Sequence, residues 1–249
     1  MHKKILTALL MILPLCACAQ VGDHRSDLSV GGNTGYVLSN VGFDPKVSQS
    51  MHSGITAGLS VKYVCEKYFS TICSIYGEVN YASMGWKQNI RTSKDEPVIN
   101  ANGTAEEYLR TLNYLQIPIF AHLAWGREQS GFNFFVQVGP QVGILLNETT
   151  TKNYETPNLS KDGSGRSNTI IEQESMPVEK KFDYGIAAGL GAEWSIPHLG
   201  HFLIEARYYY GLGNIYGNTK QDFFGKSNNS NILVKATYLF DITKSKNNR

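Results

Sequence analysis

From about residue 29 onward, the chain is built of segments in which apolar and polar side chains alternate. Such alternation places one set of side chains on each face of a β-sheet. The predicted strands are 29–40, 53–64, 72–86, 107–125, 131–146, 181–195, 201–212 and 230–242. The pattern therefore predicts an all-β protein of eight strands.

The connectors between these strands alternate in length. The short ones are 65–71, 126–130 and 196–200. The longer, polar ones are 41–52, 87–106, 147–180 and 213–229. Outer-membrane barrels have short periplasmic turns and longer external loops. We therefore predict an eight-stranded antiparallel up-and-down transmembrane β-barrel, with both termini on the periplasmic side.

One face of the predicted strands is aliphatic and aromatic, and the other is small, polar and charged. In the sixth strand, for example, Ile186 and Leu190 share one face and Asp183 lies on the other. A soluble periplasmic barrel that holds an apolar ligand, as a lipocalin does, would alternate in the same way with its apolar face inside. The direction of Glu205 and Arg207 decides between them, because these charges point inward in a membrane barrel and outward in a soluble one.

Aromatic residues lie near both ends of the predicted strands. Those at the short-turn end are Trp125, Trp194, Tyr63 and Phe240. Those at the long-loop end are Trp86, Tyr108 and Tyr210. Two aromatic girdles are expected where a barrel crosses the two membrane interfaces. The aromatic positions therefore favour the membrane barrel, while a soluble aromatic core is the alternative.

Eight charged residues lie on the polar face, four of each sign. They are Lys62, Arg110, Arg207 and Lys235, with Glu78, Asp183, Glu193 and Glu205. An eight-stranded barrel has an interior just wide enough for side chains, and an unpaired buried charge is costly. We therefore predict a lumen that is plugged by ion pairs. A narrow path for protons or ions along the same charges is the alternative.

The N-terminus has the pattern of an export signal. Basic residues at the start precede an apolar run at 5–15, and Ala17-Cys18-Ala19 supplies a cleavage site. We expect residues 1–19 to be a signal peptide and residues 20–249 to form the barrel domain. Lipoprotein processing at Cys18 and an uncleaved anchor helix are alternatives, although the apolar run is short for a spanning helix.

Two cysteines remain after the predicted signal, Cys65 and Cys73, on either side of a short turn. In an oxidising periplasm, cysteines at the base of one hairpin can form a disulfide. Two free thiols on different faces are the alternative.

The sequence indicates neither nucleic-acid binding nor a cofactor. The net charge of +2 gives no sign of a nucleic-acid-binding surface. No C-x-x-C motif or histidine cluster indicates a metal site, and we expect no cofactor.

Candidate catalytic residues are sparse. A lipid-modifying enzyme of the outer membrane needs an activated nucleophile beside a base near the external rim. His52, which precedes Ser53, is the only histidine near that rim, whereas His198, His201 and His122 lie toward the other end. We therefore expect no enzymatic activity, with a lipid-modifying enzyme as the alternative.

Four stretches of the predicted strands carry a family resemblance. They are YLQIPI (114–119), GPQVG (139–143), DYGIAAGLG (183–191) and EARYYYGL (205–212). In this order they resemble the outer-membrane β-barrel family of Bacteroidota that is often called PorT-like. The resemblance implies an eight-stranded barrel in a Gram-negative outer membrane. It implies no single function, although the family takes its name from a member associated with protein secretion.

These observations predict a non-enzymatic barrel that presents four external loops for binding or assembly. The longest loop, 147–180, is polar enough to be either a binding segment or disordered. The expected partners are outer-membrane lipid, the barrel-assembly machinery, and a protein or ligand at the external loops. The chain departs from many such barrels because a polar tail follows Phe240.

Overall fold

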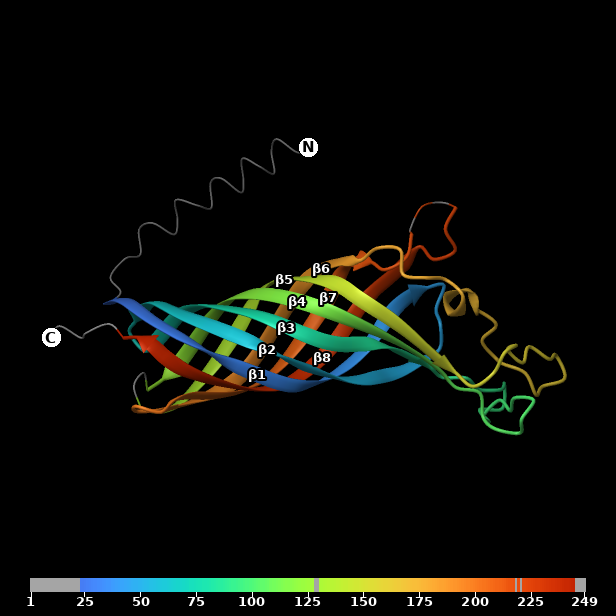
Figure 1. Cartoon of the computed structure of the whole chain (residues 1–249), viewed down its shortest axis with the longest axis horizontal. Coiled ribbons are helices and arrows are strands. Elements are labelled where there is room, and N and C mark those ends of the chain that lie inside the picture. The colour runs from blue at the N-terminus through green and yellow to red at the C-terminus, as the bar shows by residue number, and fades with distance from the viewer. Residues whose placement is uncertain (1–22, 128–129, 218, 220, 245–249) are drawn as a thin grey trace.

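The computed structural model describes residues 23–127, 130–217, 219 and 221–244. Its strands are β1 (Asp23–Asp44), β2 (Gln49–Tyr68), β3 (Thr71–Gln88), β4 (Tyr108–Gly126), β5 (Gly131–Lys152), β6 (Phe182–Ile196), β7 (Gly200–Asn214) and β8 (Lys226–Thr243). Each strand pairs antiparallel with its neighbours in the chain, and β1 pairs with β8 to close the barrel (Figure 1). The predicted eight-stranded barrel is therefore confirmed. The predicted signal peptide lies outside the described residues.

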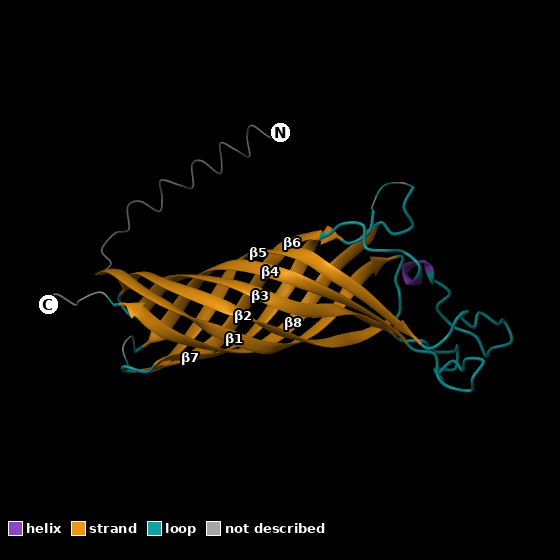
Figure 2. Cartoon of the chain, in the orientation of Figure 1, coloured by secondary structure: helices purple, strands orange, loops and turns teal. Residues whose placement is uncertain are grey.

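The two ends of the barrel differ in their connectors (Figure 2). One end has the short turns 69–70, 127–130 and 197–199, and the start of β1 and the end of β8 also lie there. The other end has the long connectors 89–107, 153–181 and 215–225. Within the described residues, the helix content is a short 3₁₀ turn, η2 (Glu172–Glu174), and no helix is long and apolar enough to cross a membrane.

The first connector is not the long loop that was predicted at 41–52. β1 and β2 continue past these bounds and are joined by residues 45–48 alone. Val41, Phe43 and Val47 are buried in the apolar cluster under the long loops. The Phe43 ring lies 5.3 Å from that of Trp86 and 4.9 Å from that of Phe224. This packing holds the segment in strand form, so the barrel has three long loops at this end and one tight turn.

The charged face of the strands points into the barrel. Glu205 and Arg207 are 2% and 3% exposed, whereas Leu190 on the opposite face is 64% exposed. The outward residues form a continuous apolar belt that includes Ile55, Leu59, Ile75, Val79, Val136, Val138, Ile186, Ile204 and Val234. An apolar surface of this extent requires a lipid environment. The soluble-barrel alternative, which needs these charges outside, is wrong.

The aromatic girdle is confirmed at the short-turn end, where Trp125, Trp194, Tyr63 and Phe240 all lie exposed on the outer surface. At the long-loop end, Tyr210 also faces outward, but Trp86 and Tyr108 are fully buried. Their predicted place in the girdle is wrong. The direction of a side chain depends on whether its position along the strand is odd or even, which we call the strand phase. Trp86 is an even number of residues from inward-facing Glu78 on β3, and Tyr108 is two residues from Arg110 on β4.

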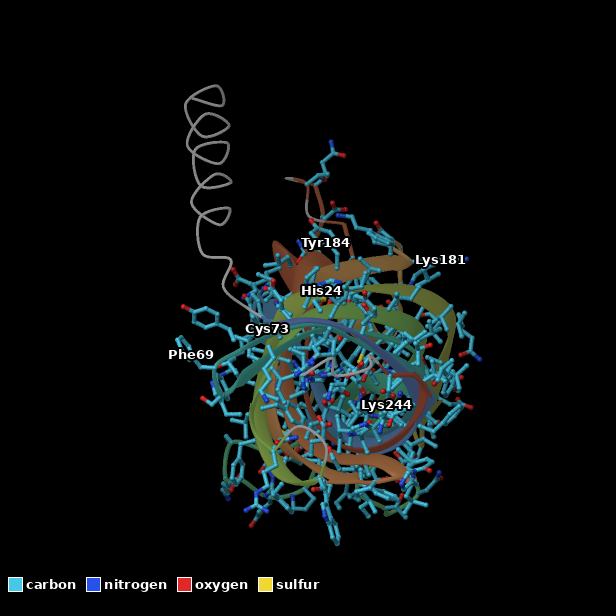
Figure 3. The ribbon with its side chains drawn as sticks, turned by 90° about the vertical axis from the view of Figure 1, so that its left-hand side faces the viewer. His24, Phe69, Cys73, Lys181, Tyr184 and Lys244 are labelled. Carbon is cyan, nitrogen blue, oxygen red and sulfur yellow. The ribbon has the colours of Figure 1, made fainter. Side chains whose placement is uncertain are left out.

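Both cysteines lie on the β2–β3 hairpin at the short-turn end, and Figure 3 labels Cys73. The register pairs Cys73 with Glu66 and shifts between Val64 and Glu66, so Cys65 lies at a bulge. The Cys65 Sγ lies 3.7 Å from the carbonyl oxygen of Tyr63, and both thiols are free. The structure therefore does not contain the predicted disulfide, although the bulge sets Cys65 and Glu66 together opposite Cys73.

Replacing Leu190 by arginine tests the assignment of the lipid-facing surface. Leu190 lies near the middle of β6, so a charge there enters the apolar belt. We expect Leu190→Arg to lower the free energy of unfolding by about 2–4 kcal/mol, measured by denaturant titration in lipid vesicles. The control is Leu159→Arg in the β5–β6 connector, which is also exposed and should change stability little. Equal losses in both variants would contradict the assignment.

Candidate functional site

The middle of the lumen holds four charged residues that neutralise one another. Arg207 Nη1 lies 2.9 Å from Glu78 Oε2, and Arg207 Nη2 lies 2.6 Å from Glu205 Oε1. Lys235 contacts Glu78 and lies 3.2 Å from Glu205. All four residues are buried. Two cations and two carboxylates in contact offset the cost of removing each charge from water. These residues, from β3, β7 and β8, form the central ion network.

Uncharged side chains complete this network. Asn80 and Gln137 donate hydrogen bonds of 2.7 Å to Glu78 and Glu205. The Arg207 guanidinium lies 4.4 Å from the centre of the Phe120 ring, within range of a cation–π contact. Viewed from the short-turn end, many side chains of the strands project into the ring that the strands form (Figure 3). The middle of the lumen is therefore closed.

A second charged group closes the short-turn mouth. Lys62 Nζ lies 2.5 Å from Glu193, and the two ring nitrogens of His201 each lie 2.9 Å from a carboxylate, Nδ1 from Glu193 and Nε2 from Asp241. Lys244 Nζ lies 2.7 Å from Asp241. These five residues come from β2, β6, β7, β8 and the position just after β8, and the His201 ring lies between the Glu193 and Asp241 carboxylates. They line a cavity of about 60 Å³.

Ser195 joins this second group through a hydrogen bond of 2.8 Å to His201 Nδ1. With Asp241 on the other ring nitrogen, the residue types are those of a hydrolase triad. However, Ser195 is buried and shares Nδ1 with Glu193. Ser195 Oγ therefore lies inside the lumen between His201 Nδ1 at 2.8 Å and Glu193 Oε1 at 3.4 Å. Strand phase places His201, Asp241 and Ser195 on the inward face, but none of the three was among the eight predicted lumen charges, and His201 was considered only as a candidate catalytic base.

Six of the eight predicted lumen charges form ion pairs with one another, and the other two have different partners. Asp183 accepts hydrogen bonds from Tyr209 Oη at 3.0 Å and Asn229 Nδ2 at 3.1 Å. Arg110 Nη2 pairs with Glu148 at 2.6 Å. Glu148 was missed because β5 continues to Lys152, beyond the predicted end of the fifth strand.

A segment of the β5–β6 connector closes the long-loop mouth. This plug segment, residues 170–176, contains η2 and the fully buried Gln173. The Gln173 carbonyl oxygen lies within 3.3–3.4 Å of Tyr108 Oη, Arg110 Nη1 and Tyr216 Oη. Ile170 and Met176 pack against the apolar cluster of the mouth. The connector predicted as either disordered or binding is therefore an ordered cap.

A buried arginine ties two of the long connectors together. Arg166 Nε lies 2.7 Å from Glu106, and Arg166 Nη1 lies 2.6 Å from Glu174. Tyr154 Oη donates a hydrogen bond of 2.9 Å to Glu174. Burial alone would lower the pKa of Arg166, but hydrogen bonds to Glu174 and its neighbours hold that pKa above its ordinary value. We call these four residues the Arg166 clasp.

The pair His52 and Ser53 does not form a site. His52 is buried in the lumen, where its Nε2 lies 3.2 Å from Thr111 Oγ1, whereas Ser53 is exposed on the outer surface. Adjacent residues of a strand point to opposite faces, so the two side chains diverge. Among the described residues, no group of three or more His, Cys, Asp and Glu side chains is placed to hold a metal ion.

The family model described as "Outer membrane protein beta-barrel domain" matches residues 18–217. The chain belongs to this family. As a member of the family, it is located in the outer membrane, which confirms the predicted location. Its short turns are then periplasmic and its long loops external, as in other barrels of this membrane. No curated protein sequence matches the chain.

Solved outer-membrane barrels are similar to this chain at low sequence identity. OprG from Pseudomonas aeruginosa is 11% identical, with a TM-score of 0.43 over 88% of this chain and 98% of OprG. Neisserial surface protein A is 10% identical, with a TM-score of 0.41 over 88% of this chain and 100% of that protein. Ail of Yersinia pestis, solved with the heparin analogue sucrose octasulfate, is 14% identical, with a TM-score of 0.35 over 86% of this chain and 99% of Ail.

Removing one carboxylate tests the central ion network. Glu78→Gln leaves the buried Arg207 and Lys235 with one anion between them. We expect a loss of about 3–5 kcal/mol in the free energy of unfolding, measured in lipid vesicles. The matched control is Glu107→Gln, which breaks the exposed pair of Glu107 with Lys87 at 3.6 Å and should cost at most about 1 kcal/mol. A loss in Glu78→Gln as small as in the control would contradict this account.

Proposed function

We propose that this chain is a non-enzymatic outer-membrane barrel that anchors an ordered set of external loops for binding or assembly with a partner. In this proposal the barrel carries no diffusing solute. The four stretches that resemble the PorT-like family of Bacteroidota support a secretion-related role. The N-terminal pattern supports export by a cleaved signal, followed by insertion through the barrel-assembly machinery.

The observation that carries the proposal is the interlocking of the external loops. The Arg166 clasp joins the β3–β4 connector to the β5–β6 connector. Ser167 adds a main-chain hydrogen bond of 2.8 Å to the carbonyl oxygen of Arg91. Long loops are costly to order, so buried ion pairs that hold two of them together support a role for their shape.

The joined loops also present apolar side chains to the outside. Ile99 and Leu159 are both exposed, and Asn158 Nδ2 lies 3.5 Å from the Ile99 carbonyl oxygen, so the two connectors are in contact beside these residues. Apolar side chains that are held on a rigid scaffold lose little entropy on binding. This feature supports a polypeptide or other ligand as the partner of the loops.

Two further features support a closed, non-catalytic barrel. The central ion network fills the middle of the lumen, and the plug segment closes its external mouth. The candidate base His52 and nucleophile Ser53 point to opposite sides of the strand. These features favour a binding role over a porin or a lipid-modifying enzyme.

Site-specific photo-crosslinking in intact cells tests the binding role. A photoreactive residue at Leu159 is expected to give a discrete adduct with one partner. The same residue at Leu190, which faces lipid, is the control and should give no such adduct. Absence of any adduct at Leu159, or a change in lipid A composition when the gene is deleted, would argue against the proposal.

Electrical recording tests the closed lumen. Reconstituted into planar bilayers, the chain is expected to show no stable open-channel conductance, because ion pairs and the plug segment occupy its path. A porin of the same membrane serves as the positive control. Steady conductance from the unmodified chain would be incompatible with a barrel that only anchors its loops.

A further inference from the structure

The external mouth has more hydrogen-bond donors than its occupant can satisfy. Three donors, Tyr108 Oη, Arg110 Nη1 and Tyr216 Oη, converge on the single carbonyl oxygen of Gln173. Their distances of 3.3–3.4 Å are long for such bonds, which cluster near 2.7–3.0 Å. A carbonyl oxygen has two lone pairs, so it cannot serve three donors well. The other acceptors within reach are no closer, since Arg110 Nη1 lies 3.4 Å from Tyr108 Oη and Tyr216 Oη lies 3.5 Å from the Met176 carbonyl oxygen.

Other polar atoms of the mouth have no partner at all. Trp86 Nε1 and Arg110 Nε are buried without an acceptor, and Oε1 of Gln173 is buried without a donor. The Gln173 side chain makes one hydrogen bond, from Nε2 to the Ile170 carbonyl oxygen at 3.1 Å. A buried polar atom without a partner costs free energy. The plug segment therefore fills the mouth in shape but matches it poorly in hydrogen bonding.

A carboxylate matches the mouth better than an amide does. Its two oxygens offer about four lone-pair sites, and hydrogen bonds from a guanidinium to a carboxylate are about twice as strong as neutral ones. Glu148 occupies Nη2 of Arg110, Nη1 makes long contacts of 3.4 Å to the Gln173 carbonyl oxygen and to Tyr108 Oη, and Nε has no acceptor. The apolar cluster of the mouth, which includes Trp86, can pack against apolar groups on either side of the carboxylate in such a ligand.

We propose that the external mouth is a binding site for an acidic side chain of a partner polypeptide, and that the plug segment holds this site closed in cis. A polypeptide is favoured because the present occupant is a tight peptide turn, flanked by Ile170 and Met176, that packs against the apolar cluster. The inference rests on the proposed function, since it names the site and the chemistry by which the external loops take their partner.

Substitution of Gln173 in the plug segment tests whether the external mouth favours a carboxylate. In Gln173→Glu a carboxylate replaces the buried side-chain amide whose Oε1 has no donor in the closed mouth, so amide hydrogen exchange over residues 170–176 should slow by about ten-fold in lipid nanodiscs if the donors of the mouth take it up. Gln173→Ala should exchange faster than the unmodified chain. If the segment were only a structural filler, the buried charge would be unfavourable and Gln173→Glu would exchange faster. That result would overturn the proposal.

Two control variants make this result specific. Gln221→Glu adds the same charge to the exposed part of the β7–β8 connector and should leave exchange over residues 170–176 unchanged. Trp86→Phe keeps the aromatic ring but removes the Nε1 donor, and it should reduce the slowing caused by Gln173→Glu. An equal slowing in Gln221→Glu would also overturn the proposal, because the effect would then be one of net charge.

Binding in trans tests the partner chemistry. A labelled peptide of residues 168–178 carrying Gln173→Glu is added to the full-length Gln173→Ala chain in nanodiscs. We expect it to bind about ten-fold more tightly than the peptide with glutamine. Equal binding of the two peptides would overturn the acidic-ligand proposal. Failure of the Leu159 crosslink, with acid-selective peptide binding retained, would instead reject the proposed function and leave the mouth as a carboxylate site.

Discussion

The narrow lumen of a closed eight-stranded barrel is the constraint on which the rest of the structure depends. Because side chains alternate along a strand, an apolar belt that faces lipid forces every second residue into that lumen. Charged residues there have little access to water, so they need ion-pair or hydrogen-bond partners. Glu78, Glu205, Arg207 and Lys235 form such pairs in contact across the barrel. The same contacts that stabilise the barrel also close it.

Strand phase was the part of this structure that could be predicted from the sequence. It placed Glu205 and Arg207 on one face and Leu190 on the other, and the structure then showed that the charged face is inside. Where position along the strand was used in place of phase, the prediction failed, as it did for Trp86 and Tyr108. Strand ends were also harder to predict than faces. Residues 41–52 are polar enough for a loop, but packing of Phe43 against the cluster under the external loops extends β1 and β2 through most of them.

Partners across the lumen could not be predicted, because they depend on the stagger of the strands. Glu78 and Arg207 lie on β3 and β7, which are not neighbours in the sheet. Arg110, by contrast, lies at the external end of β4, within reach of Glu148. The charge pattern therefore indicated that ion pairs would form, but it did not determine which residues would form them.

The two mouths of the barrel are closed in different ways, and this difference bears on function. The periplasmic mouth is closed by contacts between strands, such as Glu193 with His201, so opening it would disturb the barrel wall. The external mouth is closed by residues 170–176 of a connector, held through hydrogen bonds of 3.3–3.4 Å and apolar packing. A connector can move while every strand pair stays intact. A change of state that preserves the barrel is therefore possible at the external mouth, where the unsatisfied donors of Arg110 and Trp86 lie.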